Sequence, residues 1–136
     1  MENFKIKKIS FLPGFIPLIR SGEKTVTRRI KYKSPGPYYF TAGRSGKKQG
    51  YLWIEKAEEI GLFESFYLMG TFGPESYIKR SEEIEKEGFT NLADFMRTWN
   101  MLVPKKYKWP KDRIQIHNDP IIWRLEFKYI GEKKPC

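Results

Sequence analysis

Apolar and polar residues alternate near both ends of the chain. Close to the N-terminus, Phe4, Ile6 and Ile9 are interspersed with lysines, and residues 121–129 carry an apolar side chain at every second position. Side chains on a strand point alternately to its two faces, so this period of two predicts strands with one buried face. We therefore expect an opening strand and a closing strand, of which 121–129 has the clearest pattern.

A short helix is predicted for residues 15–21. Pro17 falls in its first turn, where proline is tolerated, and Gly22 stands where a helix C-terminal glycine is expected. Residues 75–87 predict a longer helix between Pro74 and Gly88. Its expected apolar contacts are Tyr77, Ile78 and Ile84.

A third helix is predicted for residues 91–101, with Thr90 as its cap. Its expected buried residues recur at helical spacing: Leu92, Phe95, Met96 and Trp99. Strands are expected at 25–30, which is rich in β-branched residues, at 38–41 and at 51–60. Residues 33–37 predict a turn, 43–50 a flexible basic loop, 62–72 a further strand or aromatic hairpin, and 103–112 an irregular segment.

This order of elements predicts an α+β fold. Strands precede and follow a helical segment, and no linker or repeat divides residues 1–136, so we expect a single domain. A small, partly closed β-barrel of about five to six strands, with two to three helices packed at its ends, fits this order.

The net charge of the chain limits the classes of partner that we expect. The net charge of +10 arises from 26 Lys and Arg against 16 Asp and Glu, and it predicts a surface that attracts polyanions. A charged surface typical of thermophilic proteins is the alternative, but such surfaces usually balance the two signs. No apolar run has the length of a membrane span.

Cysteine and histidine content excludes several kinds of site. Cys136 is the only cysteine and His117 the only histidine, so neither an internal disulfide nor a zinc site built on these residues can form. We expect a cytoplasmic protein without a cofactor. His117 lies beside Asn118 and Asp119, where a structural role is favoured over acid–base catalysis. The 43–50 loop lacks the Gly-Lys-Ser/Thr ending of a phosphate-binding P-loop.

Residues 24–29 combine the most donors and hydroxyls in the chain. Lys24, Thr25, Thr27, Arg28 and Arg29 are all suited to bind phosphate or carbonyl oxygens. On a regular strand Thr25, Thr27 and Arg29 share one face, whereas Lys24 follows a turn and its side chain can reach either face. An exposed charged strand without a ligand is the alternative interpretation.

Basic residues also alternate with tyrosines in two loops. The first group is Lys31, Lys33, Arg44, Lys47 and Lys48, and the second contains Lys105 and Lys106. Cations for the backbone and aromatic rings for the bases are typical of single-stranded nucleic-acid binding. The alternative is that the rings belong to the core and the lysines only keep the surface solvated.

Two segments resemble the ASCH domains, which are relatives of the PUA fold. Residues 15–29 (FIPLIRSGEKTVTRR) resemble the family's helix, glycine and Lys-Thr-x-Thr-x-Arg strand, and residues 87–95 (EGFTNLADF) resemble its Glu-Gly-Phe segment. The resemblance implies a PUA-like barrel with residues 24–27 lining a cleft, and RNA binding by some members. Residues 33–50 depart from the family's usual Gly-Asp turn, because they contain no acidic residue.

Some bacterial ASCH proteins are amidohydrolases that remove the acyl group of N4-acetylcytidine. The resemblance implies that their catalytic lysine, threonine and glutamate correspond to Lys24, Thr27 and Glu87. A lysine with a lowered pKa would deprotonate the Thr27 hydroxyl, and Glu87 would orient the lysine or shuttle a proton. We therefore expect a module that binds RNA or a nucleoside. An amidohydrolase is the first alternative, and a ribonuclease or a protein-interaction module is a further one.

Overall fold

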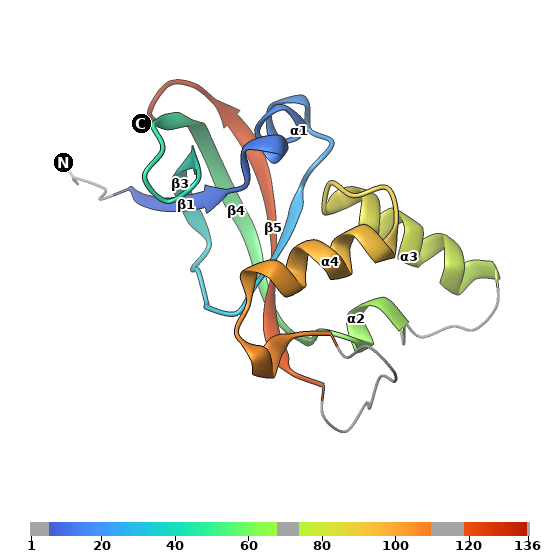
Figure 1. The fold of residues 1–136 in the computed structure, drawn as a ribbon. Coiled ribbons are helices and arrows are strands. Elements are labelled where there is room, and N and C mark those ends of the chain that lie inside the picture. Colours follow the sequence, from blue (N-terminus) through green and yellow to red (C-terminus); the bar gives the residue numbers. More distant parts are fainter. Residues whose placement is uncertain (1–5, 68–73, 110–118, 136) are drawn as a thin grey trace.

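The computed structural model describes residues 6–67, 74–109 and 119–135, within which five strands form one curled sheet (Figure 1). Its strand order is β1-β3-β4-β5-β2, in which β1 runs parallel to β3 and all other neighbours are antiparallel. The strands are β1 (Lys7–Phe11), β2 (Val26–Arg29), β3 (Gly36–Ala42), β4 (Lys48–Gly61) and β5 (Ile121–Gly131). This curled half-barrel confirms the predicted α+β class.

Helices cover one side and one end of the sheet. They are α1 (Ile16–Ser21), α2 (Glu64–Tyr67), α3 (Pro74–Lys86) and α4 (Leu92–Leu102), with 3-10 turns at Pro13–Phe15 and Lys105–Tyr107. Figure 1 shows α2, α3 and α4 gathered beside the long strands β4 and β5, with α1 at the other end of the sheet. The three predicted helices are therefore present, and α2 is additional to them.

Two clusters of buried side chains divide the core. The first lies within the curl of the sheet and includes Ile9, Phe40 and Leu125. The second joins α2, α3 and α4 to the end of the sheet and includes Phe66 and Trp99. Between the two clusters, β2 pairs with β5 and contacts α3, so its polar residues are enclosed on both sides.

Several local predictions are confirmed. Gly22 ends α1 with a φ of 84°, a left-handed conformation that favours glycine. Phe95 and Trp99 are buried on α4, as their spacing predicts. The cap of α4 is Asn91 rather than Thr90, because the Asn91 side chain accepts a hydrogen bond from the Asp94 amide at 2.8 Å. Ile84 is buried as expected, but Ile78 is exposed.

Residues 62–72 were wrongly predicted as a strand or hairpin, because their described part contains α2. The backbone amides of Phe63 and Glu64 donate to the Asp119 carboxylate at 2.7 and 2.9 Å, which caps the helix from a distant segment. Strand β3 begins inside the predicted turn, and β4 begins inside the predicted basic loop. Phe4, the side chain of Tyr77, and His117 lie outside what the structure describes.

Candidate functional site

The turn between α1 and β2 places the first polar residues of the site. The Lys24 amide donates to the Leu18 carbonyl of α1 at 3.0 Å, which closes the turn after Gly22. The Thr25 amide donates to the Lys86 carbonyl at 2.9 Å, and the Thr25 carbonyl accepts from the Phe127 amide at 2.9 Å. Thr25 thereby ties the start of β2 to the end of α3 and to β5.

Lys24 is buried, and its ammonium is surrounded by acceptors. Nζ donates to the carbonyls of Val26 at 2.8 Å and Glu87 at 2.5 Å, and it lies 3.5 Å from Oε1 of Glu87. It also lies 4.5 Å from the centroid of the Phe15 ring. Burial lowers the pKa of Lys24 to about 8, and the Glu87 carboxylate only partly opposes that shift. A substantial neutral fraction of this amine therefore exists slightly above neutral pH.

Arg28 faces the helices and joins β2 to α3. Its guanidinium donates to Oε2 of Glu87 at 2.6 Å and to Oε1 of Glu83 at 2.9 Å, while its Nε donates to the Ser65 hydroxyl at 3.2 Å. The Phe66 ring lies 4.2 Å from the guanidinium carbon. Such a planar fork satisfies two carboxylates at once, which a lysine cannot do with the same geometry.

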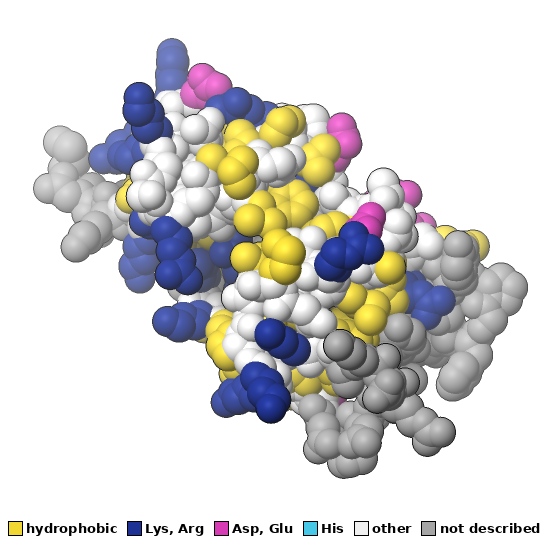
Figure 2. Space-filling model, viewed as in Figure 1, with side chains coloured by type: hydrophobic (Ala, Val, Ile, Leu, Met, Phe, Trp, Pro, Cys, Tyr) yellow, Lys and Arg dark blue, Asp and Glu magenta, His cyan; other side chains and the backbone are white. Residues whose placement is uncertain are grey.

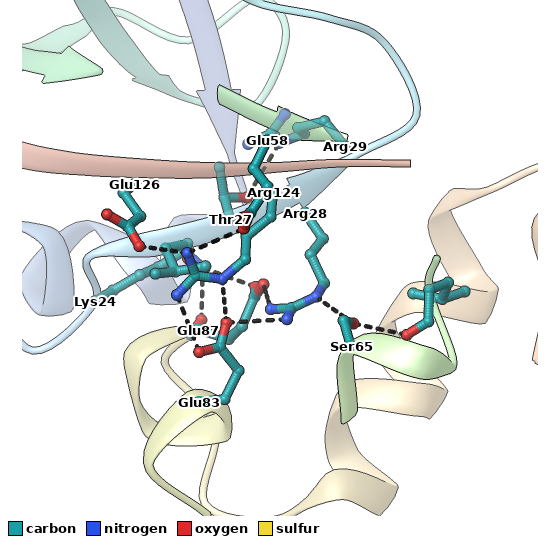
Figure 3. Close-up of polar contacts among 12 residues, drawn as sticks. Lys24, Thr27, Arg28, Arg29, Glu58, Ser65, Glu83, Glu87, Arg124 and Glu126 are labelled. Atoms are coloured by element: carbon teal, nitrogen blue, oxygen red, sulfur yellow. Dashed lines mark hydrogen bonds and ion pairs between the residues drawn. The ribbon is translucent and has the colours of Figure 1, made fainter. Parts of the chain in front are cut away.

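Arg124 on β5 binds the same helix. It donates to both carboxylate oxygens of Glu83, at 2.5 and 3.0 Å, and to Glu126 (Figure 3). Burial alone would raise the pKa of Glu83, but the hydrogen bonds from Arg124 and the charge of Arg28 bring it below its ordinary value. We call Lys24, Arg28, Glu83, Glu87 and Arg124 the buried ion network.

Thr27 is buried but points away from the buried ion network. Its Oγ1 accepts a hydrogen bond from Nε of Arg29 at 3.1 Å (Figure 3), and Arg29 also donates to the Ser10 carbonyl at 2.7 Å. Burial lowers the pKa of Arg29 to about 10. In the described part of the chain, no hydrogen bond joins the Thr27 hydroxyl to Lys24 or Glu87. The structure thus brings Lys24 and Glu87 together but engages Thr27 with Arg29.

An open cleft of about 570 Å³ lies on the other side of the buried ion network. It is lined by Arg28, Glu58, Glu59, Ile60, Gly61, Glu64, Glu83, Ile121 and Arg124. Four carboxylates and two guanidinium groups make this lining acidic, which disfavours phosphate. None of the three residues of the Lys-Thr-Glu trio contributes to it.

The cations predicted to bind nucleic acid from the two basic loops lie on the surface. Arg44, Lys47, Lys48, Lys105 and Lys106 are all exposed, while Thr25 and Arg29 are partly buried. Figure 2 shows lysine and arginine side chains gathered along the edge formed by β1 and β3, and again below α4. Arg28 was predicted at the same ligand surface, and the structure places its guanidinium inside the protein instead.

Glu83, Arg124 and Ser65 belong to the site but were not predicted from the sequence. Glu83 and Glu87 are four residues apart, so they share one face of the helix predicted for residues 75–87, and this spacing was a detectable signal. Arg124 stands at a polar position of the alternating pattern in residues 121–129. Nothing local to Ser65 or Arg124 indicates that α2 and α3 pack over them, because that contact joins distant segments.

The described residues give no sign of a metal site or a membrane span. No group of three or more His, Cys, Asp or Glu residues among them is arranged to hold a metal ion. None of the helices in the described ranges has the length and apolar character needed to cross a membrane.

Comparison with known proteins gives similarity in structure only. No family model and no curated protein matches the sequence. The ASCH domain from Lactobacillus crispatus JV V101 has a TM-score of 0.55 and 12% identity, over 93% of this chain and 81% of that one. A mutant ASCH protein from Zymomonas mobilis has a TM-score of 0.52 and 15% identity, over 92% of this chain and 70% of that one.

A third structure, a protein from Enterococcus faecalis V583, has a TM-score of 0.57 and 12% identity, over 98% of this chain and 86% of that one. The three similarities extend over nearly the whole chain and include the sheet and helices that enclose the buried ion network. At these identities they establish the fold rather than an activity. The chain therefore has the fold of ASCH domains, as its two sequence segments predict.

Proposed function

We propose that this protein binds single-stranded RNA or a nucleotide-like ligand through its exposed basic loops. The observation that carries the proposal is the distribution of charge. Glu83 and Glu87 are engaged inside the protein by Arg28, Arg124 and Lys24. The exposed cations of the loops, in contrast, form no ion pair among the described residues: Arg44, Lys47, Lys48, Lys105 and Lys106. These five cations are therefore free of any carboxylate of the described residues and available to an anionic ligand.

Aromatic rings accompany these cations. Lys48 lies 4.6 Å from the centroid of the Tyr39 ring, and Lys106 lies 5.1 Å from that of Tyr107. Both tyrosines are partly exposed. Cations that neutralise phosphates beside rings that stack on bases are the usual elements of single-stranded RNA binding.

Fluorescence anisotropy of a labelled single-stranded RNA, titrated at two salt concentrations, tests this function. Neutralisation of phosphates releases counterions, so we expect the affinity to fall steeply between 50 and 200 mM salt. Binding that is insensitive to salt, or no binding to any RNA sequence tested, contradicts the proposal.

An amidohydrolase is the second candidate, and the environment of Lys24 favours it. Its pKa of about 8 allows a neutral amine to accept the Thr27 proton. The Thr27 oxygen would then add to the acyl carbon of an N4-acylated cytidine. The bond between the acyl carbon and N4 would break as the departing N4 amine of cytidine takes up the proton from Lys24. Water would finally release the acyl group from Thr27. For the proton transfer to Lys24, the Thr27 hydroxyl must leave its hydrogen bond with Arg29 and turn toward Lys24, with which it forms no hydrogen bond in the structure.

Incubation with N4-acetylcytidine, followed by chromatography, tests this second candidate. We expect cytidine and acetate from the native chain and neither product from Lys24→Ala or Thr27→Ala. Absence of turnover at high protein concentration excludes this substrate and leaves the binding function as the proposal.

A further inference from the structure

Tyr32 lies directly beyond β2 on an aromatic support. Its ring packs against Trp123 of β5, with ring centroids 4.7 Å apart and ring planes at 63°. Trp123 pairs in register with Arg29, so the chain that leaves β2 passes over the tryptophan. Despite this contact, 54% of Tyr32 remains exposed. The residue is thus in contact with Trp123 and still largely accessible to solvent.

Four cations lie in or near the segment that carries Tyr32. Lys31 and Lys33 flank Tyr32 in the chain, and Arg29 ends the preceding strand. Lys33 lies 5.9 Å from the centroid of the Tyr38 ring, and Tyr38 pairs in register with Lys7 of β1. These contacts bring Lys7 of β1 close to Lys33, which lies in the segment between β2 and β3.

The charges of this cluster are not balanced within the described residues. Lys7, Lys31 and Lys33 form no ion pair there, whereas the charge of Glu87 acts on the partly buried Arg29. Partial burial lowers the pKa of Lys33, and the charges of Arg29, Lys7 and Lys31 lower it further. Like charges held close together destabilise one another, so an anion bound among them would relieve the repulsion.

We propose that Tyr32, supported by Trp123, is a stacking platform for one base of a single-stranded nucleic acid, whose flanking phosphates bind Lys7, Lys31 and Lys33. This inference rests on the proposed function and adds the position and the chemical group that are recognised. A free phosphate would use the cations but leave the exposed ring without a partner. The bases of a duplex stack on one another, so they are not available to Tyr32.

Affinity for a labelled ten-nucleotide RNA, measured by anisotropy at several salt concentrations, tests the platform. Loss of one stacked base weakens binding by roughly 5- to 150-fold, which is the expected effect of Tyr32→Ala. Tyr32→Phe keeps the ring and should remain within about twofold of the native chain. Trp53→Ala is the matched control, because Trp53 is an exposed aromatic residue on β4 and is expected to leave binding unchanged.

The salt dependence of the affinity distinguishes a loss of base stacking from a loss of phosphate contacts. Tyr32→Ala should lower the affinity without changing the slope of log Kobs against log salt, whereas Lys31→Gln with Lys33→Gln should reduce that slope by about 1.4. Native affinity of Tyr32→Ala for single strands, with salt-dependent binding retained, overturns the platform but leaves the proposed function intact. Equal losses of Tyr32→Ala and Trp53→Ala also overturn it. If the native chain binds an acidic polypeptide and no RNA, both proposals are wrong.

Discussion

Oε1 of Glu87 lies 3.5 Å from Nζ of Lys24, although 63 positions separate the two residues in the chain. Both side chains are almost completely buried, and Oε2 of the same carboxylate accepts from Arg28 at 2.6 Å. Glu87 thus neutralises two cations of β2 and its preceding turn from the end of α3. The contact fixes the helical layer on the sheet, and it partly opposes the lowering of the Lys24 pKa that burial causes.

Removal of the Glu87 charge should destabilise the fold strongly. Glu87→Gln leaves Lys24 and Arg28 without their shared carboxylate, and loss of one partner of a buried pair typically costs about 3–5 kcal/mol. Urea unfolding of the variant measures this loss in the free energy of unfolding. Glu132→Gln is the control, since its ion pair with Arg20 is long and exposed, and it should change stability by less than about 0.5 kcal/mol. Equal effects of the two substitutions would contradict the structural role of Glu87.

Stability should depend on pH through Lys24. Its pKa falls from 10.5 to about 8 on folding, so the unfolded chain binds more protons between these values. The contribution of this group to the free energy of unfolding therefore rises with pH through that window, by about 2 kcal/mol between pH 7.5 and 10. Lys24→Met abolishes the contribution, and the difference between the two chains should show it in urea unfolding at both pH values. A parallel pH dependence of the two chains would show that Lys24 is not the group responsible.

The long-range cap of α2 should contribute to stability. Asp119 accepts from the amides of both Phe63 and Glu64, and loss of a helix cap typically costs about 0.5–2 kcal/mol. Thermal unfolding should therefore show a lower Tm for Asp119→Ala. Asp119→Asn retains one acceptor oxygen, so its Tm should lie between that of the native chain and that of Asp119→Ala. An unchanged Tm for the alanine variant would exclude a capping role.

Much of this fold can be predicted from local patterns in the sequence. The alternation in residues 121–129 predicts β5, and the spacing of Phe95 and Trp99 predicts α4, because a single buried face dictates both patterns. The prediction for residues 62–72 was wrong because a distant residue determines the structure of this segment. Its aromatic residues suit a strand, whereas the Asp119 carboxylate that caps α2 comes from a residue more than fifty positions away.

The residues of the candidate site could also be predicted only in part from the sequence. Lys24, Thr27 and Glu87 were found through the two segments that resemble ASCH domains. The orientation of Thr27 toward Arg29 depends on where the Ser10 carbonyl of β1 lies, and sequence spacing does not reveal that position. Arg124 and Glu83 were likewise missed, because their pairing requires α3 to pack on the β2–β5 pair.

The proposed basic surface is tested most directly by the salt dependence of single-stranded RNA binding in two variants of equal net charge. The first carries Lys47→Gln, Lys48→Gln, Lys105→Gln and Lys106→Gln. The second removes four lysines from β4, α3 and β5, through Lys56→Gln, Lys79→Gln, Lys86→Gln and Lys128→Gln. If the loops bind phosphates, the slope of log Kobs against log salt falls by about 2 to 3 in the first variant alone. Equal slopes in both variants and the native chain would contradict the proposed binding surface.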